Sequence, residues 1–223
     1  MPSDPRSKYD LVVLDIAGTT VEEHNAVYVA LEEAVVAGGG TPSPADISRW
    51  MGADKVEAIT ALLPAGSDRV REVYDDFRAR LRAAYEAVPP APFDGVEKAL
   101  AELRGAGVKV VLTTGFSREV TDALLAQIGW DTGVVDDVVT AEEVGAGRPA
   151  PYLVFEAMRR TKVLDVRRVL VAGDTVLDLA TGMNAGAGAV VGVLTGAMGV
   201  EALGAVPHTH LLPGVADLPG IVL

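Results

Sequence analysis

The sequence predicts an α/β protein in which a doubly wound parallel sheet forms the core and a helical cap is inserted into it. Two patterns carry this prediction. Short apolar runs typical of strands alternate with segments of helical spacing, which favours right-handed crossovers and a sheet covered by helices on both faces. Between residues 21 and 90 the alternation stops, and helical patterns follow one another without a convincing strand.

The predicted strands are short, apolar and rich in β-branched residues, as expected for strands buried on both faces. They span residues 11–14, 108–113, 134–139, 166–172, 189–194 and 208–212. Helix ends are visible between some of them. Asp94-Gly95-Val96-Glu97 resembles a capping box that begins a helix, and Gly105 or Gly107 would end that helix.

The inserted segment contains four helical patterns. They are residues 26–36, a helix that begins at Ser43-Pro44-Ala45-Asp46, residues 55–63, and a helix marked by Val70, Val73, Phe77, Leu81 and Tyr85. Pro89-Pro90-Ala91-Pro92 is a stiff linker back to the sheet. We therefore predict a core domain of residues 1–20 and 91–223 and a helical cap domain of residues 21–90, with hinges near 20–23 and 89–92.

The composition excludes several classes of partner. The 223 residues include 19 Lys and Arg against 31 Asp and Glu, a net charge of −12 that argues against nucleic-acid binding and against a basic membrane contact. No apolar run reaches the roughly 18 residues of a membrane span, and the first residues lack an apolar signal core, so a cytoplasmic protein is expected. Without cysteine, thiolate chemistry is impossible. The sequence leaves a homodimer open.

The first candidate site follows the first predicted strand, in the run Asp15-Ile16-Ala17-Gly18-Thr19-Thr20. Open α/β sheets bind ligands at the carboxyl ends of their strands, where a carboxylate can act as a nucleophile and form an aspartyl-phosphate. Gly18 allows a sharp turn, and the hydroxyl of Thr19 can bind a phosphoryl oxygen. Alternatively, Asp15 is a helix cap or a turn residue.

Two later segments offer phosphoryl-binding groups. Thr114 and Gly115 end the strand 108–113 with a hydroxyl and a backbone N–H, although a strand that simply ends in threonine looks the same. Arg148, in Gly147-Arg148-Pro149, supplies a cation that can offset charge during phosphoryl transfer. It can equally be a surface residue of a proline-rich turn.

A pair of acids follows the strand 166–172. Asp174 and Asp178 are four residues apart at a strand-to-helix junction, so both can face the position of Asp15. Carboxylate oxygens of this kind suit Mg²⁺, which commonly takes one or two carboxylates together with phosphate and water. The alternative interpretation makes Asp174 a helix N-cap and Asp178 a first-turn residue that stabilises the helix dipole.

The four motifs occur in order along nearly the whole chain, and together they resemble the haloacid dehalogenase superfamily of hydrolases. The resemblance implies a Rossmann-like core with a helical cap after the first motif. It implies that Asp15 is the nucleophile and that Thr114 and Arg148 act on the phosphoryl group. It also implies a Mg²⁺ cofactor whose ligands are Asp15, Asp174, Asp178 and the backbone carbonyl of Ala17.

Ala17 distinguishes branches of that superfamily. Its phosphatases and phosphomutases usually carry a second Asp at this position as the general acid, and alanine cannot donate a proton. The sequence instead resembles the phosphonatase branch, which hydrolyses phosphonoacetaldehyde. Two further stretches are similar to that branch: Met51-Gly52-Ala53-Asp54-Lys55 in the cap, which adds Met51 and Gly52 as substrate-binding candidates, and Thr113-Thr114-Gly115-Phe116-Ser117-Arg118-Glu119.

A C–P bond has no leaving oxygen to protonate, so its cleavage needs no general acid at the position of Ala17. It needs an acceptor for the electrons of the C–P bond, and Lys55 can provide one. A partly neutral lysine can condense with a carbonyl, so that attack on phosphorus expels an enamine. Lys55 can also be a solvated helix residue or a simple cation. Three positions of this sequence differ from the phosphonatase branch and put the Lys55 adduct in doubt. Ala58 stands where the branch has a histidine in the cap, Phe116 where it has an aromatic residue with a hydroxyl, and Asn25 where it has a cysteine. His24, near the entry to the cap, can line the site or lie on the hinge surface, and we expect the latter. His208 and His210, near the last strand, are interpreted as structural.

We therefore predict a Mg²⁺-dependent, phosphonatase-like hydrolase that acts on a small anionic phosphonate or phosphate through an aspartyl-phosphate on Asp15. A phosphatase for a small phosphate monoester is the alternative enzyme. A dehalogenase is disfavoured by the Asp174 and Asp178 pair, and a mutase by Ala17. A non-catalytic phosphate-binding protein is the alternative from another class.

Overall fold

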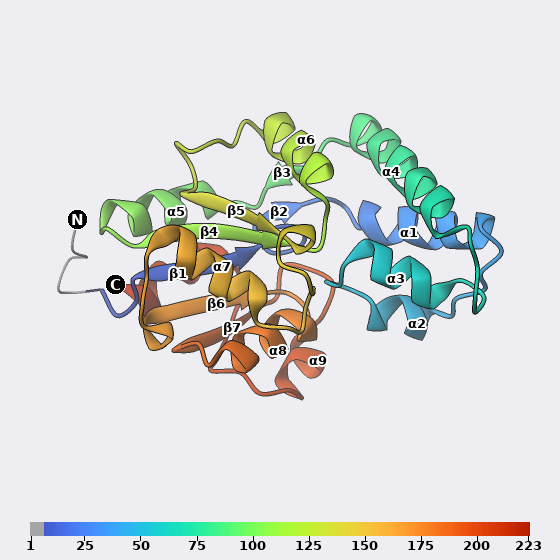
Figure 1. The fold of residues 1–223 in the computed structure, drawn as a ribbon. Helices are drawn as coiled ribbons and strands as arrows, with labels where there is room; N and C mark the ends of the chain where they lie inside the picture. Colours follow the sequence, from blue (N-terminus) through green and yellow to red (C-terminus); the bar gives the residue numbers. More distant parts are fainter. Residues whose placement is uncertain (1–6) are drawn as a thin grey trace.

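The computed structural model describes residues 7–223 and has a six-stranded parallel sheet with helices on both faces (Figure 1). The strand order is β5-β4-β1-β6-β7-β8. The strands are β1 (Leu11–Asp15), β4 (Lys109–Thr114), β5 (Asp137–Thr140), β6 (Val169–Gly173), β7 (Ala189–Val193) and β8 (His210–Leu212). The predicted α/β fold class is thereby confirmed.

Alternate residues of the buried strands divide the core into two apolar layers. Val12 and Leu14 of β1 face α5 (Val96–Gly105), α6 (Arg118–Ile128) and the C-terminal α10 (Pro219–Val222). Leu11 and Val13 face the opposite layer, which contains α7 (Tyr152–Thr161). Next to it, α8 (Val176–Ala185) covers β6 and β7, and the short α9 (Val200–Gly204) packs at the β7–β8 edge. Every position of β1 is buried, as an interior parallel strand requires.

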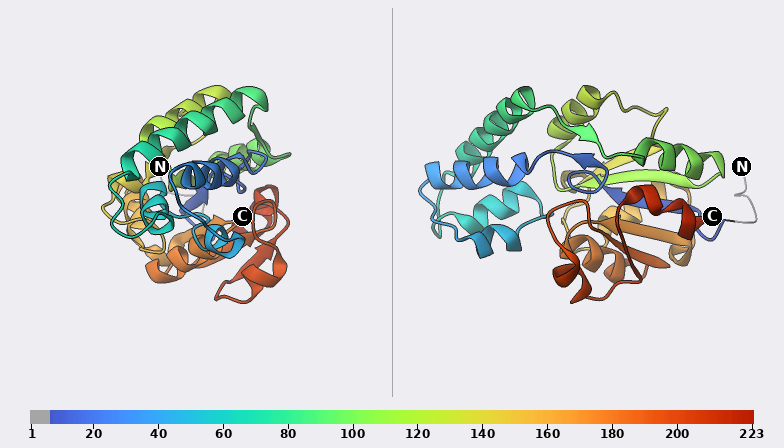
Figure 2. Two further views of the ribbon diagram at one scale, coloured as in Figure 1. Left: turned by 90° about the vertical axis from the view of Figure 1, so that its right-hand side faces the viewer. Right: turned by 180° about the vertical axis from the view of Figure 1, so that it is seen from behind.

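Four helices follow β1 in the chain and lie beyond its carboxyl end, as Figure 1 and the right-hand view of Figure 2 show. They are α1 (Ala26–Ala37), α2 (Pro44–Arg49), α3 (Lys55–Leu62) and α4 (Val70–Ala87). The longest pair, α1 and α4, is held by a row of buried side chains on α4: Val73, Phe77, Leu81 and Tyr85. This row has the helical period that the sequence shows, so a single apolar stripe explains the packing.

The chain enters and leaves the inserted helices through two short antiparallel strands, β2 (Val21–Glu22) and β3 (Ala91–Pro92). The expectation that residues 21–90 contain no strand is therefore wrong at its first two residues, and 91–92 is more than a linker. The ribbon of two strands brings both crossing points side by side, immediately beyond the turn that follows Asp15.

Strand β1 lies at the point where the strand order reverses. From β1 the chain first adds β4 and β5 on one side, and later β6, β7 and β8 on the other. In open α/β sheets the crevice at such a switch point is the usual ligand site. Asp15 is the last residue of β1, and β4 and β6 end on either side of it at Thr114 and Gly173.

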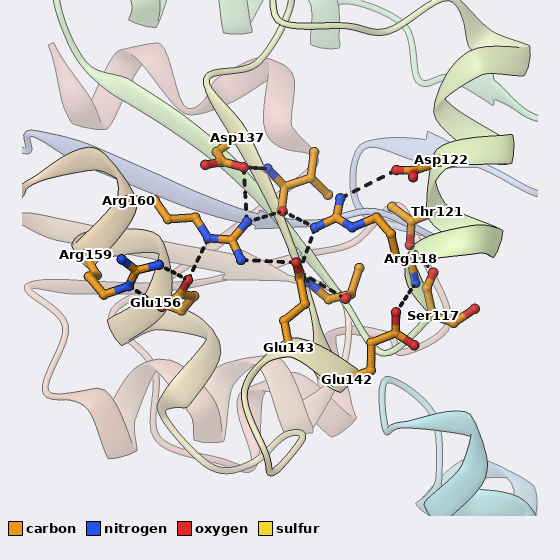
Figure 3. Close-up of polar contacts among 12 residues, drawn as sticks. Ser117, Arg118, Thr121, Asp122, Asp137, Glu142, Glu143, Glu156, Arg159 and Arg160 are labelled. Carbon is orange, nitrogen blue, oxygen red and sulfur yellow. Dashed lines mark hydrogen bonds and ion pairs between the residues drawn. The ribbon is translucent and has the colours of Figure 1, made fainter.

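Arginines tie β5 and the 3₁₀ turn η1 (Ala141–Glu143) to the neighbouring helices (Figure 3). Arg118, at the start of α6, donates to the Val138 carbonyl over 2.8 Å and pairs with Glu143 over 2.6 Å. Arg160 of α7 donates to the same carbonyl and pairs with Glu143 from the other side, over 3.2 Å. The network therefore anchors the segment that leads from β5 toward Arg148.

Several predicted boundaries were wrong for local reasons. Val134 and Val135 donate to the Asp131 carbonyl in a turn, so β5 begins only at Asp137. The 3₁₀ turn η2 (Val166–Arg168) precedes β6, since the Asp165 side chain caps it. Strand β8 begins at residue 210, after which the chain forms a further 3₁₀ turn, η3 (Val215–Asp217).

The predicted capping box at the start of α5 is also wrong. Gly95 is the N-cap residue, with a φ of 80°, and no side chain caps the helix. Glu97, the expected partner, instead accepts a hydrogen bond of 2.9 Å from the indole nitrogen of Trp130. The predicted helix end is correct, because α5 ends at Gly105. In the part of the chain that the structure describes, no helix combines the length and apolar character of a membrane span.

Candidate active site

Asp15 and Arg148 form a buried ion pair at the carboxyl end of β1, with Nη2 of Arg148 2.7 Å from Oδ1 of Asp15. Both side chains are almost wholly inaccessible to solvent. Arg148 also pairs through Nε with Asp178 over 2.9 Å and donates to both the hydroxyl and the carbonyl of Thr113. The guanidinium is thus fixed between two carboxylates, in contrast to the surface arginine that was the alternative.

Asp174 follows β6 directly and is held from two directions. Its Oδ1 accepts from the hydroxyl of Thr19 over 3.0 Å, and its Oδ2 accepts from the backbone N–H of Ala197 over 2.7 Å. The approach is close, since a Cβ on Gly196 would lie 2.0 Å from Oδ2 of Asp174. Thr19, predicted to bind substrate, here fixes an acidic side chain.

Asp178 lies in the first turn of α8 and forms a capping box with Thr175. The Thr175 side chain accepts from the Asp178 N–H, while the Asp178 carboxylate accepts from the backbone and hydroxyl of Thr175. The N-cap residue is therefore Thr175, so the alternative interpretation of Asp174 as the cap is wrong. Asp178 is therefore a first-turn residue of α8, and its carboxylate also pairs with Arg148 at the site. This position agrees both with a structural role at the start of the helix and with a role in the acidic site.

The three aspartates form a compact acidic cluster. Asp15, Asp174 and Asp178 each offer a carboxylate oxygen, and these oxygens lie within 4.8 Å of one another. Burial raises the pKa of Asp15 to about 8 although Arg148 opposes the shift, and burial with the charge of Asp178 raises the pKa of Asp174 to about 7. When all three carboxyls are ionised, their charge exceeds that of the single guanidinium, and a bound cation would stabilise this ionised form. An all-oxygen donor set with excess negative charge fits a hard divalent cation.

Thr114 and Gly115 lie where β4 ends, beside the aspartate cluster. The Thr114 hydroxyl accepts from the backbone N–H of Phe116 over 3.1 Å, which leaves its proton free for another acceptor. Thr113 has the more direct contact with Arg148, and the sequence argument missed it. Both threonines are buried, Thr113 beside Arg148 and Thr114 at the last position of β4.

Lys55 begins α3 and is buried against the core, with only 4% of its surface exposed. Its Nζ donates to the carbonyl of Ala53 over 2.8 Å and lies 5.6 Å from the ring centre of Phe116. Burial lowers the pKa of Lys55 to about 8, although Asp15 and Asp54 favour the charged form. The interpretation of Lys55 as a solvated helix residue is therefore wrong.

The loop before Lys55 touches the core at several points. The carbonyl of Gly52 accepts from Nη1 of Arg148 over 3.1 Å, and a Cβ on Gly52, at a φ of 80°, would lie 2.5 Å from Oγ1 of Thr175. A Cβ on Gly115 would lie 2.4 Å from the carbonyl oxygen of Ala53. Met51 is half-buried and packs on the main apolar cluster. The inserted helices therefore reach the aspartate cluster through this loop.

A cavity of about 360 Å³ opens between the inserted helices and the core. Ala17, Asp174 and Ala197 line it from the core side, and Glu23 and Tyr28 line it from the side of α1. Glu23 and Tyr28 could not be identified from the sequence, because each is an isolated residue without a motif around it. His24 and Asn25 also border the cavity, and His24 is half-exposed as expected of a hinge-surface histidine.

The model of the haloacid dehalogenase-like hydrolase family matches residues 9–186. This chain belongs to that family. Among curated proteins, a phosphonoacetaldehyde hydrolase of Bacillus cereus is 30% identical over 206 residues, covering 85% of this chain and 77% of that protein. A phosphonoacetaldehyde hydrolase of Bacteroides fragilis is 30% identical over 236 residues, covering 95% of this chain and 87% of that protein. The resemblance to haloacid dehalogenase-like hydrolases and to phosphonatases is therefore confirmed.

Two solved structures have the same fold as this chain. A phosphonoacetaldehyde hydrolase-like protein from Oleispira antarctica superposes with a TM-score of 0.79 at 20% identity, covering 96% of this chain and 91% of that chain. A hydrolase from Pseudomonas syringae reaches a TM-score of 0.82 at 18% identity, covering 95% of this chain and 96% of that one. The chain is thus a hydrolase of this family, with a phosphonatase-like sequence and an acidic cluster that can hold a metal ion.

Proposed function

We propose that this hydrolase cleaves the C–P bond of a small phosphonate in which the carbon bonded to phosphorus is attached to a carbonyl carbon, as in phosphonoacetaldehyde. Asp15 would be the nucleophile, and Lys55 would activate the carbonyl. The observation that carries the proposal is the pairing of Ala17 with a buried Lys55. The position that would supply a general acid holds a methyl group, while an amine of lowered pKa lies at the loop that contacts Arg148.

Phosphoryl binding follows from the fixed cation and the strand ends. Arg148 would offset the charge of the phosphoryl oxygens from its fixed position between the carboxylates, and Thr114 would donate its hydroxyl proton to one of these oxygens. The Oδ atoms of Asp15 lie at the end of β1 with Arg148 on one side, so a phosphoryl group held there faces the carboxylate. Attack of Asp15 on phosphorus would give an aspartyl-phosphate, which water then hydrolyses.

A Mg²⁺ ion fits the acidic cluster. Asp15, Asp174 and the carbonyl of Ala17 would hold it, with Asp178 adjacent or hydrogen-bonded to its water. When bound, the ion offsets the charge of the carboxylates and of the phosphoryl oxygens. Thr19 and the N–H of Ala197 would keep Asp174 oriented for this role.

Lys55 would supply the electron sink. A lysine of pKa about 8 has a neutral fraction near neutral pH that is more than a hundredfold larger than that of a solvated lysine. The neutral Nζ adds to the substrate carbonyl and, with loss of water, gives an iminium. When Asp15 attacks phosphorus, the electrons of the C–P bond move into the iminium, and the leaving group is a neutral enamine.

A phosphate monoester phosphatase is the second candidate, and the surroundings of Lys55 favour it. The residue three positions after Lys55 is Ala58, and the ring below Nζ is Phe116, so neither position supplies a hydroxyl or an imidazole to the amine. In that case Lys55 would only add positive charge. The two candidates differ in whether a covalent adduct with Lys55 forms.

The defining experiment is an assay of the purified protein with phosphonoacetaldehyde and Mg²⁺, in which phosphate and acetaldehyde are measured together. The proposal expects both products in equal amounts. Release of phosphate from p-nitrophenyl phosphate and simple phosphate esters, with none from the phosphonate, would instead support the phosphatase.

Metal dependence is a further prediction. Chelation of divalent ions should reduce phosphate release at least about 10³-fold, because three buried carboxylates would then face the phosphoryl group with one guanidinium. Added Mg²⁺ should restore the activity. Full activity in excess chelator would mean that the cluster needs no metal for the reaction.

The same proposal treats residues 21–90 as a cap that opens and closes over a core of residues 1–20 and 91–223, with hinges at β2 and β3. Closure would bring Lys55 to the aspartates and exclude water. Gly115 tests this, because the Ala53 carbonyl approaches it so closely. We expect Gly115→Ala to wedge the loop away and lower kcat/KM at least about tenfold.

The control for this variant is Gly105→Ala at the end of α5, where no atom lies within 4 Å of the added Cβ. It should leave kcat/KM within about twofold of wild type. Equal activity of Gly115→Ala and wild type would show that the Ala53 contact does not govern the reaction.

A further inference from the structure

The loop of residues 194–199, between β7 and α9, reaches the acidic cluster from a part of the chain that carries none of the sequence motifs. The hydroxyl of Thr195 donates to the carbonyl of Gly18 over 2.7 Å. The backbone N–H of Ala197 donates to Oδ2 of Asp174, also over 2.7 Å. The proposed reaction uses the Ala197 contact, and Thr195 has no role in it.

These two contacts belong to a closed ring of hydrogen bonds. On the other side of Asp174, Oδ1 accepts from the hydroxyl of Thr19 over 3.0 Å, and Thr19 directly follows Gly18. The ring therefore runs from the turn after β1 through the Asp174 carboxylate to the loop after β7. It returns to the turn through the Thr195 hydroxyl, which joins the two segments without passing through Asp174.

Two glycines allow the ring to close tightly around the Asp174 carboxylate. A Cβ on Gly18, at a φ of 80°, would lie 2.6 Å from Oδ2 of Asp174, and a Cβ on Gly196 would lie 2.0 Å from the same atom. Neither position leaves room for a side chain. Because the carboxylate is held between the turn and the loop, a change in their separation would move Asp174.

The same turn carries the carbonyl of Ala17, which would be the backbone ligand of the metal ion. The N–H of Gly18 donates to the carbonyl of Val21 over 2.9 Å, which holds the peptide unit between Ala17 and Gly18. The hydroxyl of Thr195 holds the next peptide unit by its carbonyl. The Ala17 carbonyl is therefore fixed relative to the loop that also holds Asp174.

The loop is itself anchored to the core on both sides of Thr195. Before it, the N–H of Leu194 donates to the carbonyl of Leu212 in β8 over 3.1 Å. After it, the sulfur of Met198 accepts from the N–H of Val176, at the start of α8, over 3.3 Å. A loop that is anchored in this way can hold the turn after β1 in place rather than follow its movements.

We propose that Thr195 is a positioning residue for the divalent ion, because its hydroxyl sets the separation between the Ala17 carbonyl and the Asp174 carboxylate. The inference rests on the proposed function, since it requires that these two groups bind Mg²⁺. Mg²⁺ demands nearly ideal octahedral geometry at about 2.0–2.1 Å, whereas Ca²⁺ accepts longer and less regular contacts. Two donors held at a fixed separation therefore favour Mg²⁺, and this preference depends on the Thr195 hydroxyl.

The test measures the binding of metal ions rather than turnover. Metal-free wild type, Thr195→Val and Thr195→Ser are titrated calorimetrically with Mg²⁺ and, separately, with Ca²⁺. Valine keeps the branched shape of the side chain without the hydroxyl, and serine restores the hydroxyl. Thr161→Val at the end of α7 is the matched control, since the Thr161 hydroxyl also donates to a backbone carbonyl, that of Ala157, over 2.8 Å.

We expect Thr195→Val to bind Mg²⁺ at least about tenfold more weakly than wild type, as is usual when a group that orients a metal ligand is lost. Its affinity for Ca²⁺ should stay within about threefold, and Thr195→Ser should bind both ions within about threefold of wild type. Without metal, the unfolding temperature of Thr195→Val should lie within about 5 °C of wild type, because one hydrogen bond is lost. Thr161→Val should match wild type in both affinities.

Three outcomes would contradict the inference, and they can be told apart. Wild-type affinity for Mg²⁺ in Thr195→Val would mean that the hydroxyl does not set the geometry of the metal site. Equal loss of Mg²⁺ and Ca²⁺ affinity, or a much lower unfolding temperature without metal, would mean that Thr195 only supports the fold of the loop. Absence of Mg²⁺ binding in wild type would overturn the metal site of the proposed function, and the role of Thr195 with it.

Discussion

Asp15→Asn should abolish turnover, with kcat at least about 10⁴-fold below wild type, which corresponds to about 5 kcal/mol of transition-state stabilisation. The amide keeps the shape of the side chain but is a poor nucleophile and weakens the acidic cluster as a metal site. Arg148 would lose the carboxylate that lies 2.7 Å away, while its pair with Asp178 remains. Phosphate release measured with Mg²⁺ and phosphonoacetaldehyde gives kcat directly.

The fold of Asp15→Asn should survive. Burial raises the pKa of Asp15, which means that its charged form is costly to bury, and a neutral amide avoids that cost. Without metal, the thermal unfolding temperature should equal or exceed that of wild type. Asp217→Asn, an exposed change at η3, serves as the matched control and should remain fully active. Turnover by Asp15→Asn within tenfold of wild type would exclude Asp15 as the nucleophile.

Lys55→Arg should lower turnover of a carbonyl phosphonate at least about 10³-fold. The substitution keeps the positive charge but removes the amine, and a guanidinium of pKa above about 12 cannot form the iminium. Turnover of p-nitrophenyl phosphate by this variant should fall far less, because that substrate needs no adduct. Initial rates with both substrates give the comparison, and Lys98→Arg on the exposed side of α5 is the control.

The pH dependence gives a second readout on Lys55. The reaction needs the neutral amine, and the pKa of Lys55 is lowered to about 8. Turnover of the phosphonate should therefore rise as the pH increases through about 8. The rise should be steeper than that of p-nitrophenyl phosphate turnover, which needs only the Asp15 carboxylate, whose pKa burial also raises to about 8. If Lys55→Arg retains most of its phosphonate turnover, the amine has no covalent role in the reaction.

The sequence is informative about the site because three of its motifs lie at the end of a strand. Strands β1, β4 and β6 are continuous apolar runs, and parallel pairing brings their ends together, so Asp15, Thr114 and Asp174 could be grouped before their distances were known. The stripe of α4 was equally predictable, since Phe77 and Leu81 repeat with the helical period.

Contacts between distant segments could not be predicted in this way. Glu97 completes a capping-box pattern in the sequence, yet its carboxylate accepts a hydrogen bond from the indole nitrogen of Trp130 and caps no helix. The approach of Gly52 to Thr175 and of Ala53 to Gly115 depends on how the inserted helices pack against the core. Glu23 is one acid among many until the fold buries it in the cavity wall.

The central claim is that Lys55 and Asp15 act in turn on one substrate. The most direct test is mass spectrometry of the Lys55 peptide after cyanoborohydride reduction in the presence of phosphonoacetaldehyde and Mg²⁺. The account predicts an ethyl group on Lys55 in wild type, where the C–P bond has been cleaved, and a phosphonoethyl group in Asp15→Asn, where it has not. Phosphate release by wild type without an adduct on Lys55, or the same ethyl adduct in Asp15→Asn, would contradict it.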